Sequence, residues 1–146
     1  MALGTLVDGN VLLDLITEDE NWLERSSDAL ARAADDGPLL IDPIIYAEVS
    51  VRFSRIEDVE EALPGSDYGR LAVSWESAFL AGMAFLAYRR NRGRRSATLP
   101  DFLIGAHAAV AHLRLLTRDA TRYRTYFPTV QLTSPDRTSP GRHRRA

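Results

Sequence analysis

The stretch TLVDGNVLLDL, residues 5–15, decides the fold because its apolar pattern changes at a single acid, Asp8. Residues 3–7 form a short apolar run, which is typical of a buried strand. After the acid, apolar residues recur at helical spacing: Val11, Leu12, Leu15 and Ile16. The Asp8-Gly9 pair would also suit a hairpin turn, but the helical spacing that follows favours the order strand, acid, helix.

The same alternation of strand and helix continues to residue 132. Further strands are expected at 38–41, 113–117 and 129–132. Helices are expected at 20–35, 43–53, 75–91, 101–112 and 118–127, with a shorter helix and a loop at 56–70. Asp42-Pro43 marks the start of the helix at 43–53, with Asp as the N-cap and Pro at the first position. Alternating strands and helices build parallel sheets that helices cover on both faces. We therefore predict an α/β domain over residues 1–132, a three-layer α/β/α sandwich with a short, mostly parallel central sheet. A basic, disordered tail is expected at 133–146.

The composition excludes several chemistries. Cysteine is absent, which removes disulfides, thiolate metal sites and cysteine nucleophiles. Every one of the 18 basic residues is an arginine, so a P-loop lysine and a Schiff-base amine are excluded as well. No apolar run approaches the roughly 20 residues of a membrane helix, and the N-terminus has no signal-like segment. We expect a cytoplasmic protein with no membrane partner.

The charges are divided unevenly along the chain. Residues 1–88 carry 17 acids and 5 arginines, whereas residues 89–146 carry 3 acids and 13 arginines. A basic region of this kind would suit a polyanion. Solvated helix faces and a basic tail explain the split equally well.

Three acids stand at places where chemistry or simple helix capping would put them. Asp8 and Asp119 each follow an expected strand, and ligands of open α/β sheets bind beyond the carboxyl ends of the strands. An acid at a helix start also satisfies free N–H groups, so capping alone explains each of these two. For Asp101 capping is the stronger alternative, because Thr98 and Asp101 have the spacing of a capping box.

Glu48 is harder to explain as a surface residue. On a helical wheel it falls among the apolar side chains Ile45, Val49 and Val51. A carboxylate in such a stripe must be paired, protonated or bound to a metal. An ion pair with Arg52, four residues along the helix, is the simplest alternative.

Four acids gathered at one edge of the sheet would repel one another, and a divalent cation is the usual way to neutralise them. Oxygen ligands without cysteine favour Mg²⁺, or Mn²⁺, over zinc. His107 and His112 lie five residues apart, which is not a ligand spacing, so we interpret them as core or surface residues. Asp14 is expected to be a solvated helix position.

Four blocks of the sequence resemble the motif blocks of PIN-domain ribonucleases, in that family's order and spacing. The blocks are LVDGNVLLDL (6–15), DPIIYAEVS (42–50), LPDFLIGAHA (99–108) and LLTRDATRYRTYFP (115–128). Within this family the chain most resembles the VapC toxins of bacterial type II toxin–antitoxin pairs. The resemblance covers roughly residues 3–132. One departure is Gly9, where the family usually has Thr or Ser.

The resemblance implies a catalytic metal site with named ligands. Its acids are Asp8, Glu48, Asp101 and Asp119, of which the first and third would be the firmest direct ligands. Asn10 would orient Asp8, and Thr117 would stand beside Asp119. A cluster of arginines before the third block would bind RNA phosphates: Arg89, Arg90, Arg92, Arg94 and Arg95. Arg118 and Arg122 are weaker candidates for the same role.

The resemblance also implies an activity and partners. We expect a Mg²⁺-dependent endoribonuclease, the toxic component that inhibits growth until its antitoxin neutralises it, with water as the nucleophile. Transfer RNA would be the substrate, a VapB-type antitoxin would insert an arginine among the acids, and the toxin would be a homodimer.

Two other functions compete with this reading. An aspartyl-phosphate phosphatase would need a second Asp where this chain has Asn10, and a lysine that it does not have. A catalytically inactive PIN-like module that binds RNA or an antitoxin is the non-enzyme alternative. Such a module would have no reason to keep a repulsive cluster of four acids.

Overall fold

The central sheet is built from very short strands. The computed structural model describes residues 3–92 and 97–135, and within them five strands pair, all in parallel, in the order β3-β2-β1-β4-β5. The strands are β1 (Thr5–Val7), β2 (Leu39–Ile41), β3 (Gly69–Arg70), β4 (Arg114–Leu116) and β5 (Leu132–Thr133). The predicted sheet is therefore confirmed, and it is wholly rather than mostly parallel.

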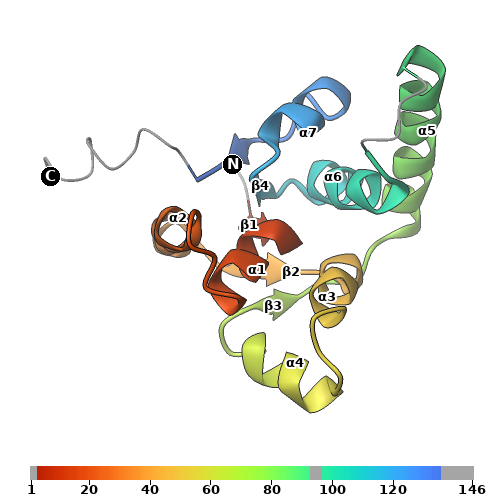
Figure 1. Cartoon of the computed structure of the whole chain (residues 1–146). Coiled ribbons are helices and arrows are strands. Elements are labelled where there is room, and N and C mark those ends of the chain that lie inside the picture. Colours follow the sequence, from red (N-terminus) through yellow and green to blue (C-terminus); the bar gives the residue numbers. More distant parts are fainter. Residues whose placement is uncertain (1–2, 93–96, 136–146) are drawn as a thin grey trace, which may run out of the picture.

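Helices cover this sheet, and the expected three-layer α/β/α sandwich is confirmed (Figure 1). The helices are α1 (Gly9–Ile16), α2 (Leu23–Asp35), α3 (Pro43–Ser50), α4 (Ile56–Ala62), α5 (Trp75–Arg92), α6 (Leu99–Ala111) and α7 (Ala120–Tyr126). Helix α5 lies alongside α6 as an outer element, farther from the sheet (Figure 1). None of the helices in the described part of the chain is long and apolar enough to span a membrane.

Local signals in the sequence explain where the core elements begin and end. Leu6 and Leu115 on the two central strands are completely buried, as their apolar runs predict. Asp42 caps α3 by accepting a hydrogen bond from the backbone N–H of Ile45 at 2.9 Å, as expected. Val51 was expected within the apolar stripe of α3, but that helix ends at Ser50 and the Val51 side chain is 79% exposed.

Two strands differ from the prediction. Strand β3 falls within 56–70, where only a helix and a loop were expected. It is a two-residue edge strand that pairs with β2. Gly69 permits this close approach, because a Cβ there would lie 2.8 Å from the side chain of Leu40. The last strand is β5, later than the predicted 129–132, because it pairs with Leu115 and Leu116 in a register that local sequence does not encode.

The strand order places a switch point between β1 and β4. Successive strands run from β1 outward to β2 and β3, whereas β4 and β5 lie on the other side. Open parallel sheets form a crevice at the carboxyl ends of the strands at such a point. Asp8 lies there, directly after β1, and its backbone N–H donates to the carbonyl of Leu116 at 2.9 Å.

Candidate metal centre

Asp8 is the most deeply buried of the four predicted acids, with 5% of its surface exposed. Two neutral hydroxyl groups donate to its Oδ2 atom, Thr117 Oγ1 at 2.8 Å and the Tyr123 phenol at 3.2 Å. The side chain of Asp8 does not cap α1, so helix capping does not explain this acid. The alternative of a hairpin turn at Asp8-Gly9 is also wrong, because α1 begins at Gly9.

The hydroxyl donors do not offset the cost of burying this charge. The pKa of Asp8 is raised to about 6, chiefly by desolvation. The two hydrogen bonds lower this pKa, and the nearby charge of Asp101 raises it. Burial, followed by the Asp8 charge, also raises the pKa of the Tyr123 phenol well above its ordinary value. Tyr123 therefore remains a protonated donor at physiological pH.

Glu48 comes from α3 and packs against the start of α1. A Cβ on Gly9 would lie 2.8 Å from Glu48 Oε1 and 3.3 Å from Glu48 Cβ, so the glycine makes room for this carboxylate. Desolvation raises the pKa of Glu48 to about 7, and the charges of Asp8 and Asp101 contribute. The alternative of an ion pair with Arg52 is not observed between these two described residues.

Asp101 has the structural role that the Thr98 spacing predicted, and a second one. Its Oδ2 atom accepts from the backbone N–H of Thr98 at 2.9 Å and from the Thr98 hydroxyl at 3.1 Å, which completes the cap of α6. The same oxygen accepts from Arg122 Nη1 at 3.2 Å. Capping and membership of the acidic cluster are therefore compatible.

Asp119 lies at the outer edge of the group and is half-exposed. Its Oδ2 atom accepts from Asn10 Nδ2 at 3.2 Å and is 3.9 Å from Arg122 Nη1. Its backbone N–H donates to Thr117 Oγ1 at 3.0 Å, so this hydroxyl links Asp119 with Asp8. Asn10 was expected to orient Asp8, but its two side-chain contacts are with Asp119 and with the backbone N–H of Arg118.

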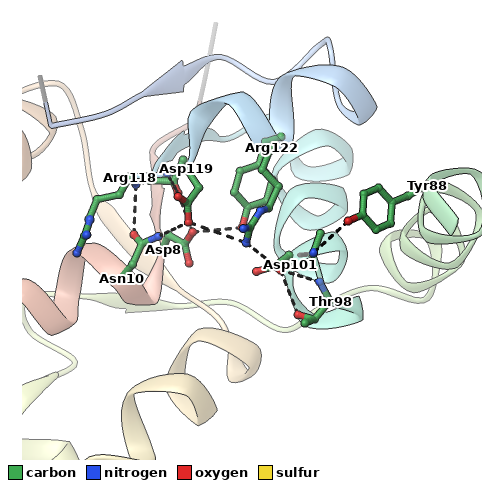
Figure 2. Close-up of polar contacts among 11 residues, drawn as sticks. Asp8, Asn10, Tyr88, Thr98, Asp101, Arg118, Asp119 and Arg122 are labelled. Carbon is green, nitrogen blue, oxygen red and sulfur yellow. Dashed lines mark hydrogen bonds and ion pairs between the residues drawn. The ribbon is translucent and has the colours of Figure 1, made fainter. Parts of the chain in front are cut away.

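The four acids, which we call the acidic cluster, offer only carboxylate oxygens, the donors that Mg²⁺ and Mn²⁺ prefer. The donor chemistry therefore fits the expected ion, and the raised pKa values of Asp8 and Glu48 show that their charges are poorly neutralised by the protein. In the described residues, however, no three acidic or histidine side chains are already gathered at metal-binding distance. Figure 2 shows that Arg122 lies between Asp119 and Asp101.

Sequence reasoning missed two α7 residues that contact the cluster, Arg122 as a partner of the acids and Tyr123. It was also wrong about Asp14, which is 2% exposed rather than solvated. Asp14 accepts from the Ser26 hydroxyl at 2.6 Å and pairs with Arg118 at 2.8 Å. Ser26 and Arg118 lie 12 and 104 positions from Asp14 in the sequence, so no local pattern predicts that these residues bind it.

The sequence likewise assigned Asp42 only to helix capping. Its second oxygen lies 2.7 Å from Nδ1 of His107, and both side chains are buried. His107 is thus a core residue, one of the two interpretations given above. The pair joins the start of α3 to the middle of α6, the two helices that supply Glu48 and Asp101.

The predicted RNA-binding arginines are only partly described. Arg89 and Arg90 are exposed near the end of α5, and the Arg89 guanidinium lies 5.6 Å from the centre of the Phe85 ring. Arg94 and Arg95 lie outside the described residues, as does the side chain of Arg92. Arg118, a weaker candidate, is engaged by the protein itself. Its guanidinium pairs with Asp14 and stacks 4.1 Å from the Trp22 ring centre.

Comparison with known proteins identifies the family of the chain. The family model of the PIN domain matches residues 5–128. The chain belongs to the PIN-domain family, whose members are typically nucleases that use divalent metal ions. A search of curated proteins finds no match.

The fold is shared with chains of several solved structures, among them a toxin–antitoxin complex. VapBC2 from Rickettsia felis, bound to a promoter DNA fragment, matches with a TM-score of 0.68 and 18% identity, covering 92% of this chain and 100% of that one. A toxin–antitoxin complex from Klebsiella pneumoniae matches with 0.62 and 23%, over 91% and 98%. FitAcB from Neisseria gonorrhoeae matches with 0.68 and 18%, over 90% and 97%.

Proposed function

We propose that this protein is a Mg²⁺-dependent endoribonuclease, with Mn²⁺ as an alternative ion, and the toxin of a VapBC-type toxin–antitoxin pair. One observation carries the nuclease proposal. A buried carboxylate, Asp8, stands at the switch point of a PIN fold, and a second one, Glu48, packs against the next residue, Gly9. Each has a raised pKa because of burial and neighbouring acids. A purely structural site would gain nothing from charges that destabilise one another.

The chain's own residues would hold the ion and the substrate. Asp8, Glu48, Asp101 and Asp119 would bind the metal, which when bound supplies Lewis acidity, activates water and stabilises a phosphodiester transition state. Thr117 and Tyr123 would keep Asp8 in one orientation through their hydroxyl donors. Asn10 would do the same for Asp119. No protein nucleophile is required, which suits a chain without cysteine.

Recognition of RNA would come from the basic half of the chain. Arg89 and Arg90 are exposed on α5, which packs on the helix that carries Asp101, and Arg92, Arg94 and Arg95 follow in the sequence. Arginine forks bind phosphate oxygens strongly and without regard to base sequence. They would hold the backbone while the acids act on one phosphate. Transfer RNA is the proposed substrate class on the resemblance to VapC toxins.

The proposed partners follow from the same relatives. The structures named above include a toxin–antitoxin complex and VapBC2 bound to promoter DNA, which supports a VapB-type antitoxin as the regulator of this chain. The proposal also includes a homodimer and a cytoplasmic site of action. Inhibition of translation would be the consequence of cleaving transfer RNA.

The test is cleavage of a total RNA pool by the purified full chain. Reactions with Mg²⁺, with EDTA, and with the Asp8→Asn variant in Mg²⁺ are compared in parallel. We expect discrete fragments only in the first, with a loss of at least about 100-fold for the variant, because a carboxylate ligand and its charge are removed together. Arg55→Gln, which alters an exposed ion pair with Glu57 at the start of α4, is the matched control and should cleave normally.

The inactive-module alternative makes the opposite prediction. In that case wild type, EDTA and Asp8→Asn reactions would all match a no-protein lane, while RNA would still be retained in a gel-shift assay. Cleavage that persists in EDTA would contradict the metal requirement instead.

A further inference from the structure

One cation already stands inside the acidic cluster, and it belongs to the protein. Arg122, on the short helix α7, places its Nη1 atom 3.2 Å from Asp101 Oδ2 and 3.9 Å from Asp119 Oδ2 (Figure 2). Both acids are among the proposed metal ligands. The arginine therefore supplies positive charge to Asp101 and Asp119.

The contact is well anchored on the acid's side. Asp101 Oδ2 also accepts from the backbone N–H and the hydroxyl of Thr98, so three donors converge on one oxygen. The next residue of α7, Tyr123, donates to Asp8 at 3.2 Å and fixes the helix against the cluster. The helix thus delivers a neutral donor to one acid and a charged donor to another from adjacent positions.

The arginine nevertheless has a route out of the cluster. Its side chain is 32% exposed, compared with 17% for Asp101. Arginine has a long side chain with several rotamers, so the guanidinium can swing toward water without moving α7. A partly exposed ion pair is also weak enough to break when a stronger cation competes for the same oxygen.

We propose that Arg122 is an internal competitor of the divalent metal, which neutralises Asp101 and Asp119 in the metal-free protein and must leave Asp101 before the ion is bound. The inference rests on the proposed function. Magnesium requires oxygens at about 2.0–2.1 Å, and a guanidinium hydrogen-bonded to the same oxygen would stand next to a doubly charged ion. Because binding effects are reciprocal, a metal that expels the arginine is bound less tightly for having to do so.

The first experiment measures metal binding without RNA. The metal-free full chain is titrated with Mn²⁺ at neutral pH, and free ion is followed by its electron paramagnetic resonance signal. We expect Arg122→Gln to bind Mn²⁺ about tenfold more tightly than wild type, the scale of a charge effect at this distance. Arg124→Gln is the matched control, since it removes the same charge from an exposed position on the same helix and should stay within about twofold of wild type.

A second measurement uses the wild-type chain and does not depend on how well a variant folds. In a ¹⁵N-labelled sample, Mg²⁺ titration is expected to shift the Arg122 Nε–Hε resonance as the guanidinium leaves Asp101. The Arg124 resonance serves as the reference and should move little.

The outcomes separate this inference from the proposed function. Equal or weaker Mn²⁺ binding by Arg122→Gln, or an Arg122 resonance that is static while the metal binds, would overturn competition but leave the nuclease proposal intact. Absence of Mn²⁺ binding in wild type and both variants would overturn both. Tighter binding by Arg122→Gln alone, together with the resonance shift, supports the competitor role.

Discussion

The two sides of the acidic cluster solve the same electrostatic problem differently. Asp8 is buried and held by two neutral hydroxyl donors, Thr117 and Tyr123, so its charge is oriented but not cancelled. Asp101 and Asp119 are more exposed and face a guanidinium, that of Arg122. The pKa of Asp8 is raised, because hydrogen bonds from hydroxyls do not replace the solvation that burial removes.

This difference indicates what each side contributes to the proposed metal site. On the Asp8 side, a buried negative charge is held in a fixed position without a cation beside it among the described residues, which favours binding of a metal ion. On the Asp101 side, Arg122 balances the negative charge until an ion binds. An antitoxin arginine that enters the site would likewise balance the negative charge of Asp8.

The largest expected effect tests the unmet charge of Asp8 directly. Because the folded-state pKa, about 6, lies above the ordinary value of 3.8, the folded protein takes up this proton more readily than the unfolded chain. The stability that protonation provides is fully present below pH 3.8 and is lost as the pH rises through 6. In EDTA, Asp8→Asn should therefore be more stable than wild type at pH 8, by on the order of 3 kcal/mol, and by about half as much at pH 5.

Urea unfolding of both proteins at the two pH values checks this prediction. The Asp8 charge is one cause of the raised pKa of Glu48, about 7, so its removal also lowers the Glu48 pKa and adds to the stability gain of Asp8→Asn at pH 8. A variant that is less stable than wild type at pH 8 would show that Asp8 is satisfied as an ion, and the contrast between the two sides would be lost.

The next effect concerns the neutral donor itself. Tyr123→Phe removes the phenol that donates to Asp8 at 3.2 Å, and a hydrogen bond to a charged group contributes about 1–2 kcal/mol. We expect a loss of that size in EDTA at pH 8 and a smaller one at pH 5, where Asp8 is protonated. Tyr126→Phe, on the same helix, is the control. Equal losses for the two variants would mean that Tyr123 acts only through packing.

Local sequence signals predicted a good part of this molecule. The change of apolar pattern at Asp8 predicted β1 and α1, and Asp42-Pro43 and the Thr98-Asp101 spacing predicted the starts of α3 and α6. Each of these depends on residues within a few positions of one another. Such patterns act through the period of a helix or the free N–H groups at its end.

The contacts that complete the cluster have no such local origin. Tyr123 meets Asp8 across 115 positions in the sequence, and Arg118 meets Asp14 across 104. From the sequence alone Asp14 looks like any polar residue on an amphipathic helix. Only the pairing of β1 with β4 brings α7 and the segment before it to the first helix, and with them the donors of both acids.

A third prediction concerns Glu48, whose side chain occupies the space that the missing Cβ of Gly9 leaves open. Gly9→Ala puts a Cβ within 2.8 Å of Glu48 Oε1, the far end of a flexible side chain, so the carboxylate should move. We expect Mn²⁺ affinity to fall by about tenfold, as for other changes behind metal ligands. The free energy of unfolding should change by less than about 1 kcal/mol, because alanine favours the helix.

Gly82→Ala on α5 is the control for that variant, since a Cβ there meets nothing within 4 Å. It should leave metal binding unchanged and stabilise the protein slightly. Unaltered Mn²⁺ affinity in Gly9→Ala would show that Glu48 is not required near Asp8. The departure from the Thr or Ser usual in the family would then be without consequence for the site.

The smallest effect asks whether Asp119 belongs to the charged side or the neutral one. Asn10 donates to Asp119 at 3.2 Å in an exposed contact and accepts from the backbone N–H of Arg118 at 3.3 Å in a part-buried one. If Arg122 already neutralises Asp119, Asn10→Ala should lower the free energy of unfolding by only about 0.5 kcal/mol in EDTA, because each hydrogen bond is weak and alanine's helix propensity partly offsets the loss.

The matched control is Asn91→Ala on α5, which gains the same helix propensity and should be no less stable than wild type. A loss for Asn10→Ala as large as that for Tyr123→Phe would place Asp119 with Asp8, as an acid that depends on neutral donors. Arg122 would then neutralise Asp101 alone.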